Sequence, residues 1–217
     1  MNCDYIARWY RWLEYIGFGG ALEQRRFAFL TDVADAQRVL VLGEGDGRFL
    51  AAFVKQCKVE QKHPRKACFS IDYVDASVRM LELARRRAGT DDVTYHHADA
   101  LEIPLPEAEY DLIVTHFFLD CLNDHDGTSL IERLSASIQP RGRWLISEFR
   151  EPAWWARGIV AALYLFFKIA TGLRTRRLID HHALLSKKGF VLQKEETARF
   201  GLLASELWLF TGDNRSR

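Results

Sequence analysis

The sequence predicts an α/β fold: a doubly wound, mostly parallel sheet of seven strands that closes with an antiparallel C-terminal hairpin. Three observations predict it. Residues 39–42 form an uninterrupted apolar run that leads into a glycine-rich turn and a helix, as expected of a central strand covered on both faces. β-like and helical segments then alternate as far as residue 149. Finally, the β-like segments 191–200 and 202–211 follow each other directly, which predicts the hairpin.

The composition is typical of one globular domain. With 217 residues, 48% hydrophobic and 27% charged, the chain suits a single domain over 1–217. Its net charge of +1 argues against a general affinity for nucleic acid. The four cysteines form no metal-ligand spacing, so we expect reduced thiols in the cytoplasm and no metal site. The N-terminus has no secretion-signal pattern.

Residues 1–30 predict two helices with a glycine break at 17–20. The apolar positions of the first helix share one face, which indicates packing on the core. The alternative is a lid over a binding site, which the many aromatic residues favour. A polar connector over 31–37 follows.

The glycine turn carries Gly43, Gly45 and Gly47, and a helix over 48–57 follows it. Glycines leave room for a ligand against the backbone, and the helix start offers free N–H groups. The spacing G-x-G-x-G differs from the G-x-G-x-x-G of dinucleotide-binding enzymes, because Arg48 stands where the third glycine of that motif would fall.

Two further strands end in acidic residues. A strand over 69–75 ends at Asp75 and precedes a helix from residue 76 to 85, and a strand over 93–97 precedes Asp99. His96 and His97 end that strand, where alternation sends one ring to each face, and no further ligands are spaced for a metal. The fourth strand spans 110–116.

Three motifs occur in order: V-L-x-L-G-x-G-x-G over 39–47, V-D-A-S-x-x-M-L-E-L-A over 74–84, and A-D-A over 98–100. Together they resemble the class I S-adenosylmethionine-dependent methyltransferases, whose sheet is Rossmann-like, over residues 38–149. The resemblance implies S-adenosylmethionine as cofactor, with Asp75 on the ribose hydroxyls and Asp99 on the adenine amine. The implied cofactor-binding residues are Gly43, Glu44, Gly45, Gly47, Asp75, Ala76, Asp99, Ala100 and Thr115.

One position departs from the family pattern. The family has Asp or Glu two residues before the first glycine, and this chain has Val41. Glu44 or Asp46 in the turn would then be the substitute that anchors the cofactor's amino group.

The end of the fourth strand is expected near the transferred methyl group, because ligands bind beyond the carboxyl ends of parallel strands. We predict His116 as general base, since its unperturbed pKa lies near neutrality, with Asp120 orienting it. The alternatives are that His116 fixes the loop by a hydrogen bond and that Asp120 caps a helix.

The second half predicts a helix over 128–139, a break at 140–142 and a strand over 143–149. Glu148 then lies on the same edge as His116, where it contacts substrate or caps a loop. A short helix follows at 180–188, with His181 and His182 as surface or capping residues.

The insertion over 150–188 should decide the substrate. Its apolar run, 158–167, is ten residues long, too short to span a membrane. It is a buried or homodimer-contact helix, the wall of an apolar pocket, or a patch that contacts a membrane surface. The seven cations and two acids of 151–190 fit either contact with anionic lipid or an ordinary solvated face. The predicted substrate residues are Phe117, Phe118, Glu148, Trp154, Trp155 and Tyr164.

These patterns predict methyl transfer to a small, apolar or aromatic acceptor by direct displacement. The chain is also similar to the branch that methylates quinones and lipid-like acceptors. A catalytically silent binding module is the alternative, because of Val41. A nicotinamide-dependent oxidoreductase is disfavoured, because Asp75 lies 32 residues after Gly43 where about 20 is expected.

Overall fold

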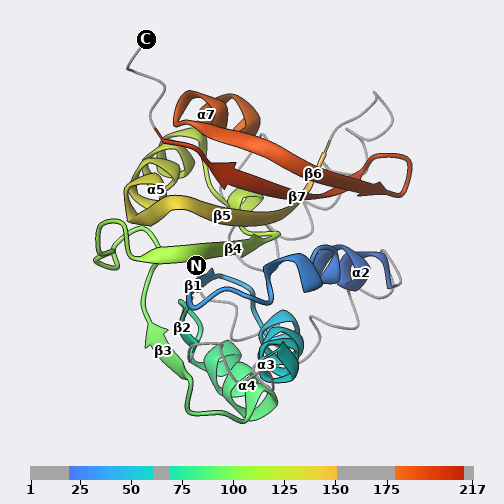
Figure 1. Cartoon of the computed structure of the whole chain (residues 1–217), viewed down its shortest axis with the longest axis vertical. Coiled ribbons are helices and arrows are strands. Elements are labelled where there is room, and N and C mark those ends of the chain that lie inside the picture. Colours follow the sequence, from blue (N-terminus) through green and yellow to red (C-terminus); the bar gives the residue numbers. More distant parts are fainter. Residues whose placement is uncertain (1–19, 61–68, 151–178, 213–217) are drawn as a thin grey trace.

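The predicted seven-stranded sheet is present. The computed structural model describes residues 20–60, 69–150 and 179–212 (Figure 1). The strand order is β3-β2-β1-β4-β5-β7-β6. The strands are β1 (Arg38–Leu42), β2 (Ser70–Asp75), β3 (Val93–His97), β4 (Tyr110–His116), β5 (Ile138–Phe149), β6 (Phe190–Ala198) and β7 (Leu203–Phe210).

The first five strands are parallel, and β7 is antiparallel to both β5 and β6. The order reverses beside β1, because the chain moves outward from β1 to β2 and β3 and then returns to β4 on its other side. In such sheets ligands bind beyond the carboxyl ends of the strands at this switch point. The glycine turn that follows β1 lies at that point.

Helices cover both faces of the sheet (Figure 1). On one face α3 (Arg48–Glu60) and α4 (Val78–Ala88) pack with Val39 and Val41 of β1. On the other, α5 (Asp124–Ser137) and α7 (His181–Lys187) pack with Leu40 and Leu42. Successive residues of β1 therefore enter opposite cores, which explains its unbroken apolar run.

Several predicted boundaries shift. The helix predicted from 128 begins at Asp124, because the side chain of Asn123 accepts a hydrogen bond from the N–H of Asp126 and caps the helix there. Helix α4 continues to Ala88 and ends at Gly89, whose φ of 56° gives a left-handed cap. In the N-terminal region α2 spans Ala21–Phe27, a 3-10 turn spans Thr31–Val33, and the first predicted helix lies outside the described residues.

The predicted break at 140–142 is a bulge inside β5. Tyr110 pairs with Ile138, and the register then shifts so that Leu112 pairs with Arg143. The additional residues include Arg141, whose φ of 67° bends the chain. The regular ladder starts at Arg143, where the sequence predicted the strand.

The prediction for the two histidines of α7 is wrong for His181. Its side chain is buried and contacts the carboxylate of Glu206. Asp180 caps the helix instead, accepting a hydrogen bond from the N–H of Ala183 at 3.0 Å. None of the described helices combines the length and apolar character needed to cross a bilayer.

Candidate active site

The glycine turn has left-handed backbone angles, with φ of 60° at Gly43 and 85° at Gly45. The N–H of Gly43 donates to the carbonyl of Val74, which ties the turn to β2. A Cβ at Gly43 would lie 2.2 Å from the ring of Phe118, whereas one at Gly45 would meet no heavy atom within 4 Å. At Gly47 a Cβ would lie 2.4 Å from the backbone of Ala84. The turn is therefore packed at both ends and open over Gly45.

The two acids of the turn have protein partners. Glu44 is buried, and its carboxylate accepts hydrogen bonds from the N–H of Phe49 at 3.0 Å and the hydroxyl of Tyr73 at 3.2 Å. Burial raises the pKa of Glu44 to about 7, and the charge of Arg26 opposes this. Asp46 accepts from Arg48 at 2.9 Å and also pairs with Arg87. Both acids thus stabilise the turn and the start of α3.

Asp75 and Asp99 end neighbouring strands. Oδ1 of Asp75 accepts from the N–H of Ser77 at 2.8 Å, while the next residue, Ala76, accepts from His97 through its carbonyl. Asp99 is exposed, and its Oδ1 accepts from the N–H of Leu101 at 2.9 Å. Two carboxylates and the glycine turn therefore share one edge of the sheet.

Arg133 of α5 fixes the loop that carries Asp99 and the buried Ala100. Its guanidinium donates to the carbonyl oxygen of Ala100 at 3.1 Å and to those of Leu101 and Ile103. The sequence analysis missed this residue, because an arginine in an amphipathic helix has no signal that separates it from a solvent-exposed one.

His116 lies buried behind the glycine turn, with its ring edge against Phe49 at a centroid distance of 4.7 Å. Its Nδ1 is 3.0 Å from Oγ of Ser147. The same hydroxyl lies 3.0 Å from the carbonyl oxygen of Arg25 and 3.2 Å from the hydroxyl of Ser205. Nε2 of His116 has no hydrogen-bond partner among the described residues.

The pKa of His116 lies well below its usual range, because of its burial and, second, the charge of Arg26. The imidazole is therefore neutral at physiological pH. Arg26, in α2, is itself buried, and its guanidinium lies 5.3 Å from the centroid of the Phe117 ring. The sequence analysis missed Arg26, which it placed only within a helix.

Asp120 contacts Glu148. The two carboxyl groups are buried near the ends of β4 and β5, and each affects the ionisation of the other. Oε1 of Glu148 also accepts from the N–H groups of Phe118 and Leu119, at 3.1 and 2.8 Å. Burial raises the pKa of Asp120 to about 6. Burial and the charge of Asp120 together raise the pKa of Glu148 well above its usual range. Both carboxyl groups therefore keep their protons to a higher pH than exposed carboxyl groups do.

The remaining predicted residues divide between the core and the insertion. The hydroxyl of Thr115 accepts from the indole N–H of Trp144 at 3.0 Å inside the core. Phe117 packs toward α2 in a cluster with Ala21 and Leu22, while Phe118 lies over Gly43. Trp154, Trp155 and Tyr164 lie outside the described residues.

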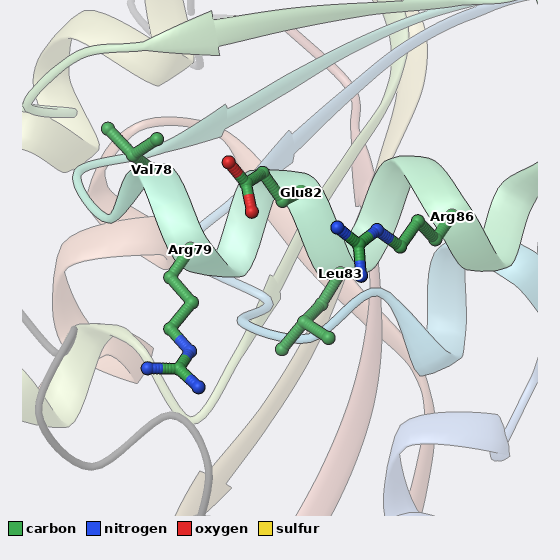
Figure 2. Close-up of a pocket in the computed structure, with 5 residues that line it drawn as sticks. All are labelled: Val78, Arg79, Glu82, Leu83 and Arg86. Carbon is green, nitrogen blue, oxygen red and sulfur yellow. The ribbon is translucent and has the colours of Figure 1, made fainter.

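A separate cavity of about 500 Å³ lies along α4. Figure 2 shows the five described residues that line it, on consecutive turns of this helix: Val78, Arg79, Glu82, Leu83 and Arg86. None of them is a predicted site residue.

Comparison with known proteins identifies the domain. Residues 39–142 match the family model of a methyltransferase domain. The matched residues include the three motifs and the strands that position Asp75, Asp99 and His116.

Two curated relatives are demethylmenaquinone methyltransferases. That of Deinococcus radiodurans is 29% identical to this chain over 130 residues, 59% of the chain and 49% of the relative. That of Thermus thermophilus is 29% identical over 152 residues, 69% of the chain and 64% of the relative. The chain thus spans less than two thirds of the length of either.

Solved structures share the fold. The chain superposes on the 1,6-didemethyltoxoflavin N1-methyltransferase of Burkholderia thailandensis with a TM-score of 0.66 at 17% identity, over 96% of this chain and 86% of the other. That structure holds 1,6-didemethyltoxoflavin and S-adenosylhomocysteine.

Proposed function

We propose that the protein transfers a methyl group from S-adenosylmethionine to a small apolar or aromatic acceptor. The observation that carries the proposal is the juxtaposition of the glycine turn, Asp75 and Asp99 at the carboxyl ends of β1, β2 and β3. A carboxylate at such a strand end accepts hydrogen bonds from two ribose hydroxyls at once. An exposed carboxylate one strand further, Asp99, suits an exocyclic adenine amine.

The turn fits a cofactor that lies against the backbone. A Cβ added at Gly45 would meet no heavy atom within 4 Å, so there is open space over this residue. The ring of Phe118 borders the turn at Gly43. Position 41 carries no acid, and Glu44 accepts the N–H of Phe49 at the start of α3, so Glu44 supports the turn against which the cofactor lies. Arg26 supplies buried positive charge near Glu44 and His116, which suits the carboxylate of the methionine end.

The cofactor supplies an activated methyl group, and the protein aligns the acceptor with it. Two groups near the end of β4 can take the acceptor's proton. We assign this role to Asp120 with Glu148, because one of the two carboxyl groups is ionised near neutral pH. His116, which burial keeps neutral, then orients the ligand.

For the acceptor we propose an aromatic ring that bears an acidic hydroxyl, such as a quinol. The names of the curated relatives support it, as does Phe118 beside the glycine turn. Contact of the insertion with substrate, a membrane surface or a second subunit stays a prediction, because 151–178 lies outside the described residues. A cytoplasmic location also stays a prediction.

The first experiment is calorimetric titration with S-adenosylmethionine and S-adenosylhomocysteine. We expect binding that Asp75→Ala weakens at least tenfold, with NAD as a ligand that does not bind. Transfer of a labelled methyl group to a naphthoquinol without its ring methyl then tests the acceptor. Failure to bind either cofactor form, with the fold intact by circular dichroism, would overturn the proposal.

A second candidate, a silent binding module, predicts a different pattern. Such a protein could bind the cofactor and still transfer no methyl group to any aromatic hydroxyl compound. Single-turnover assays over a panel of phenols and quinols separate the two.

A further inference from the structure

A second polar cluster surrounds Glu206, in the middle of β7. The carboxylate is buried, with 1% of the side chain exposed. Nε2 of His181 lies 3.0 Å from its Oε2, and Nε2 of His182 lies 2.9 Å from its Oε1. The guanidinium of Arg150 also contacts Oε1, and the indole N–H of Trp208 donates to Oε2 at 2.7 Å. No predicted cofactor or substrate residue belongs to this cluster.

The geometry around His182 points to a cation site. Its Nε2 is 2.7 Å from Nη2 of Arg150 as well as 2.9 Å from the carboxylate. A guanidinium has only donors, so a neutral imidazole nitrogen facing it presents its lone pair. The nitrogen of His182 and the oxygen of Glu206 are then two acceptors directed at one positive charge, which Arg150 provides.

We propose that His181, His182 and Glu206 form a binding site for a divalent transition metal ion of the zinc type. One ligand atom from each residue lies within 4.8 Å of the others. Around a tetrahedral zinc ion, with ligand distances of about 2.0–2.2 Å, such atoms are separated by about 3.3 Å. Two imidazoles and one carboxylate are a ligand set that zinc accepts, with the fourth position left for water.

The surroundings suit a bound metal. The indole N–H of Trp208 donates to the carboxylate of Glu206 and fixes its orientation. Residues next to a metal site commonly orient its ligands in this way. Arg150 also contacts Glu195 on β6, so it keeps an anionic partner when a metal displaces it from Glu206. The bound ion would join β7 directly to the start of α7.

The test is titration of the purified, chelator-treated full chain with zinc by calorimetry, and with cobalt by visible absorption. We expect one ion per chain and the absorption bands of tetrahedral cobalt. His182→Asn, at a side chain that is 39% exposed, should weaken binding at least about 100-fold, since loss of even an outer partner costs about 10- to 100-fold. His125→Asn, at an exposed histidine on α5, is the matched control and should leave binding unchanged.

Arg150→Gln should change the zinc affinity in the opposite direction from His182→Asn. Because it removes the competing positive charge, we expect zinc to bind about tenfold more tightly. Circular dichroism establishes that each variant is folded. Equal zinc uptake by the native chain and His182→Asn, or no tightening in Arg150→Gln, would overturn the metal site and leave a purely structural cluster. The titration uses no cofactor, so its outcome is independent of the proposed methyl transfer.

Discussion

The carboxyl group of Glu148 lies against that of Asp120, although they follow different strands of the sheet. Burial raises both pKa values, and the N–H groups of Phe118 and Leu119 hold Glu148 in place. A carboxyl pair of this kind keeps one proton to higher pH than either acid does alone.

Asp120→Asn should change stability in a pH-dependent way. The pKa of Asp120 is raised to about 6, so between about pH 4 and 6 the folded protein holds a proton that the unfolded chain has lost. Stability therefore falls as pH rises through this window. Relative to its effect at pH 4, the substitution should stabilise the protein by about 1–3 kcal/mol at pH 8. Urea unfolding at both pH values measures this, and an equal effect at both would contradict the raised pKa of Asp120.

The same variant tests the catalytic assignment. Methyl transfer should fall by about 100-fold or more, because a positioned base contributes about 10²–10⁴. Binding of S-adenosylhomocysteine should stay within about twofold. If His116→Asn lowers the rate more than Asp120→Asn and moves the pH profile, His116 is the base instead.

Glu44→Gln should also stabilise the protein at high pH. The pKa of Glu44 is raised to about 7, so ionisation costs stability as pH rises from about 4.5 through 7. Glutamine removes this cost of about 1–3 kcal/mol and still accepts from the N–H of Phe49. Glu44→Ala is the control: it removes the same ionisation cost but also loses the acceptor, so it should be less stable than Glu44→Gln by about 1–3 kcal/mol at both pH 5 and pH 8. Thermal unfolding at the two pH values distinguishes these outcomes.

Arg133→Ala should weaken cofactor binding indirectly, through the loop that carries Asp99. The guanidinium holds three carbonyl groups of the loop after β3, so its loss frees Asp99. We expect about tenfold weaker binding of both S-adenosylhomocysteine and methylthioadenosine, which share the adenine; this equals about 1.4 kcal/mol. Lysine should not rescue it, because one ammonium cannot replace the planar fork. Arg86→Ala, in the α4 cavity, is the control and should leave both affinities unchanged.

Gly43→Ala should show strong coupling with Phe118. The new Cβ would lie 2.2 Å from the ring, at a φ of 60°. We expect a loss of about 1–3 kcal/mol. Phe118→Ala removes the overlap, so the double variant should lose at least about 1 kcal/mol less than the sum of the two. Additive losses in denaturant unfolding would mean that backbone strain alone is responsible; Gly45→Ala, in open space, measures that strain.

Local patterns were sufficient for the elements that carry the cofactor motifs. The apolar run of β1, the glycine turn and the acids at the ends of β2 and β3 depend on neighbours in the chain, so their spacing determines strand, turn and helix. The predicted sheet with its antiparallel hairpin is confirmed for the same reason. The predicted start of helix α5 was four residues too late, because the prediction relied on the apolar positions of the helix and did not use Asn123 as its N-cap.

Tertiary structure decided what each polar side chain contacts. Glu206 is 24 residues from His182 and faces it only because β7 pairs with β5 beneath α7. Likewise, Arg133 reaches the loop after β3, and Asp120 contacts Glu148 rather than remaining a cap. Spacing along the chain determines local structure, but burial and long-range pairing determine which charges meet, and hence the pKa values and ligands of the site.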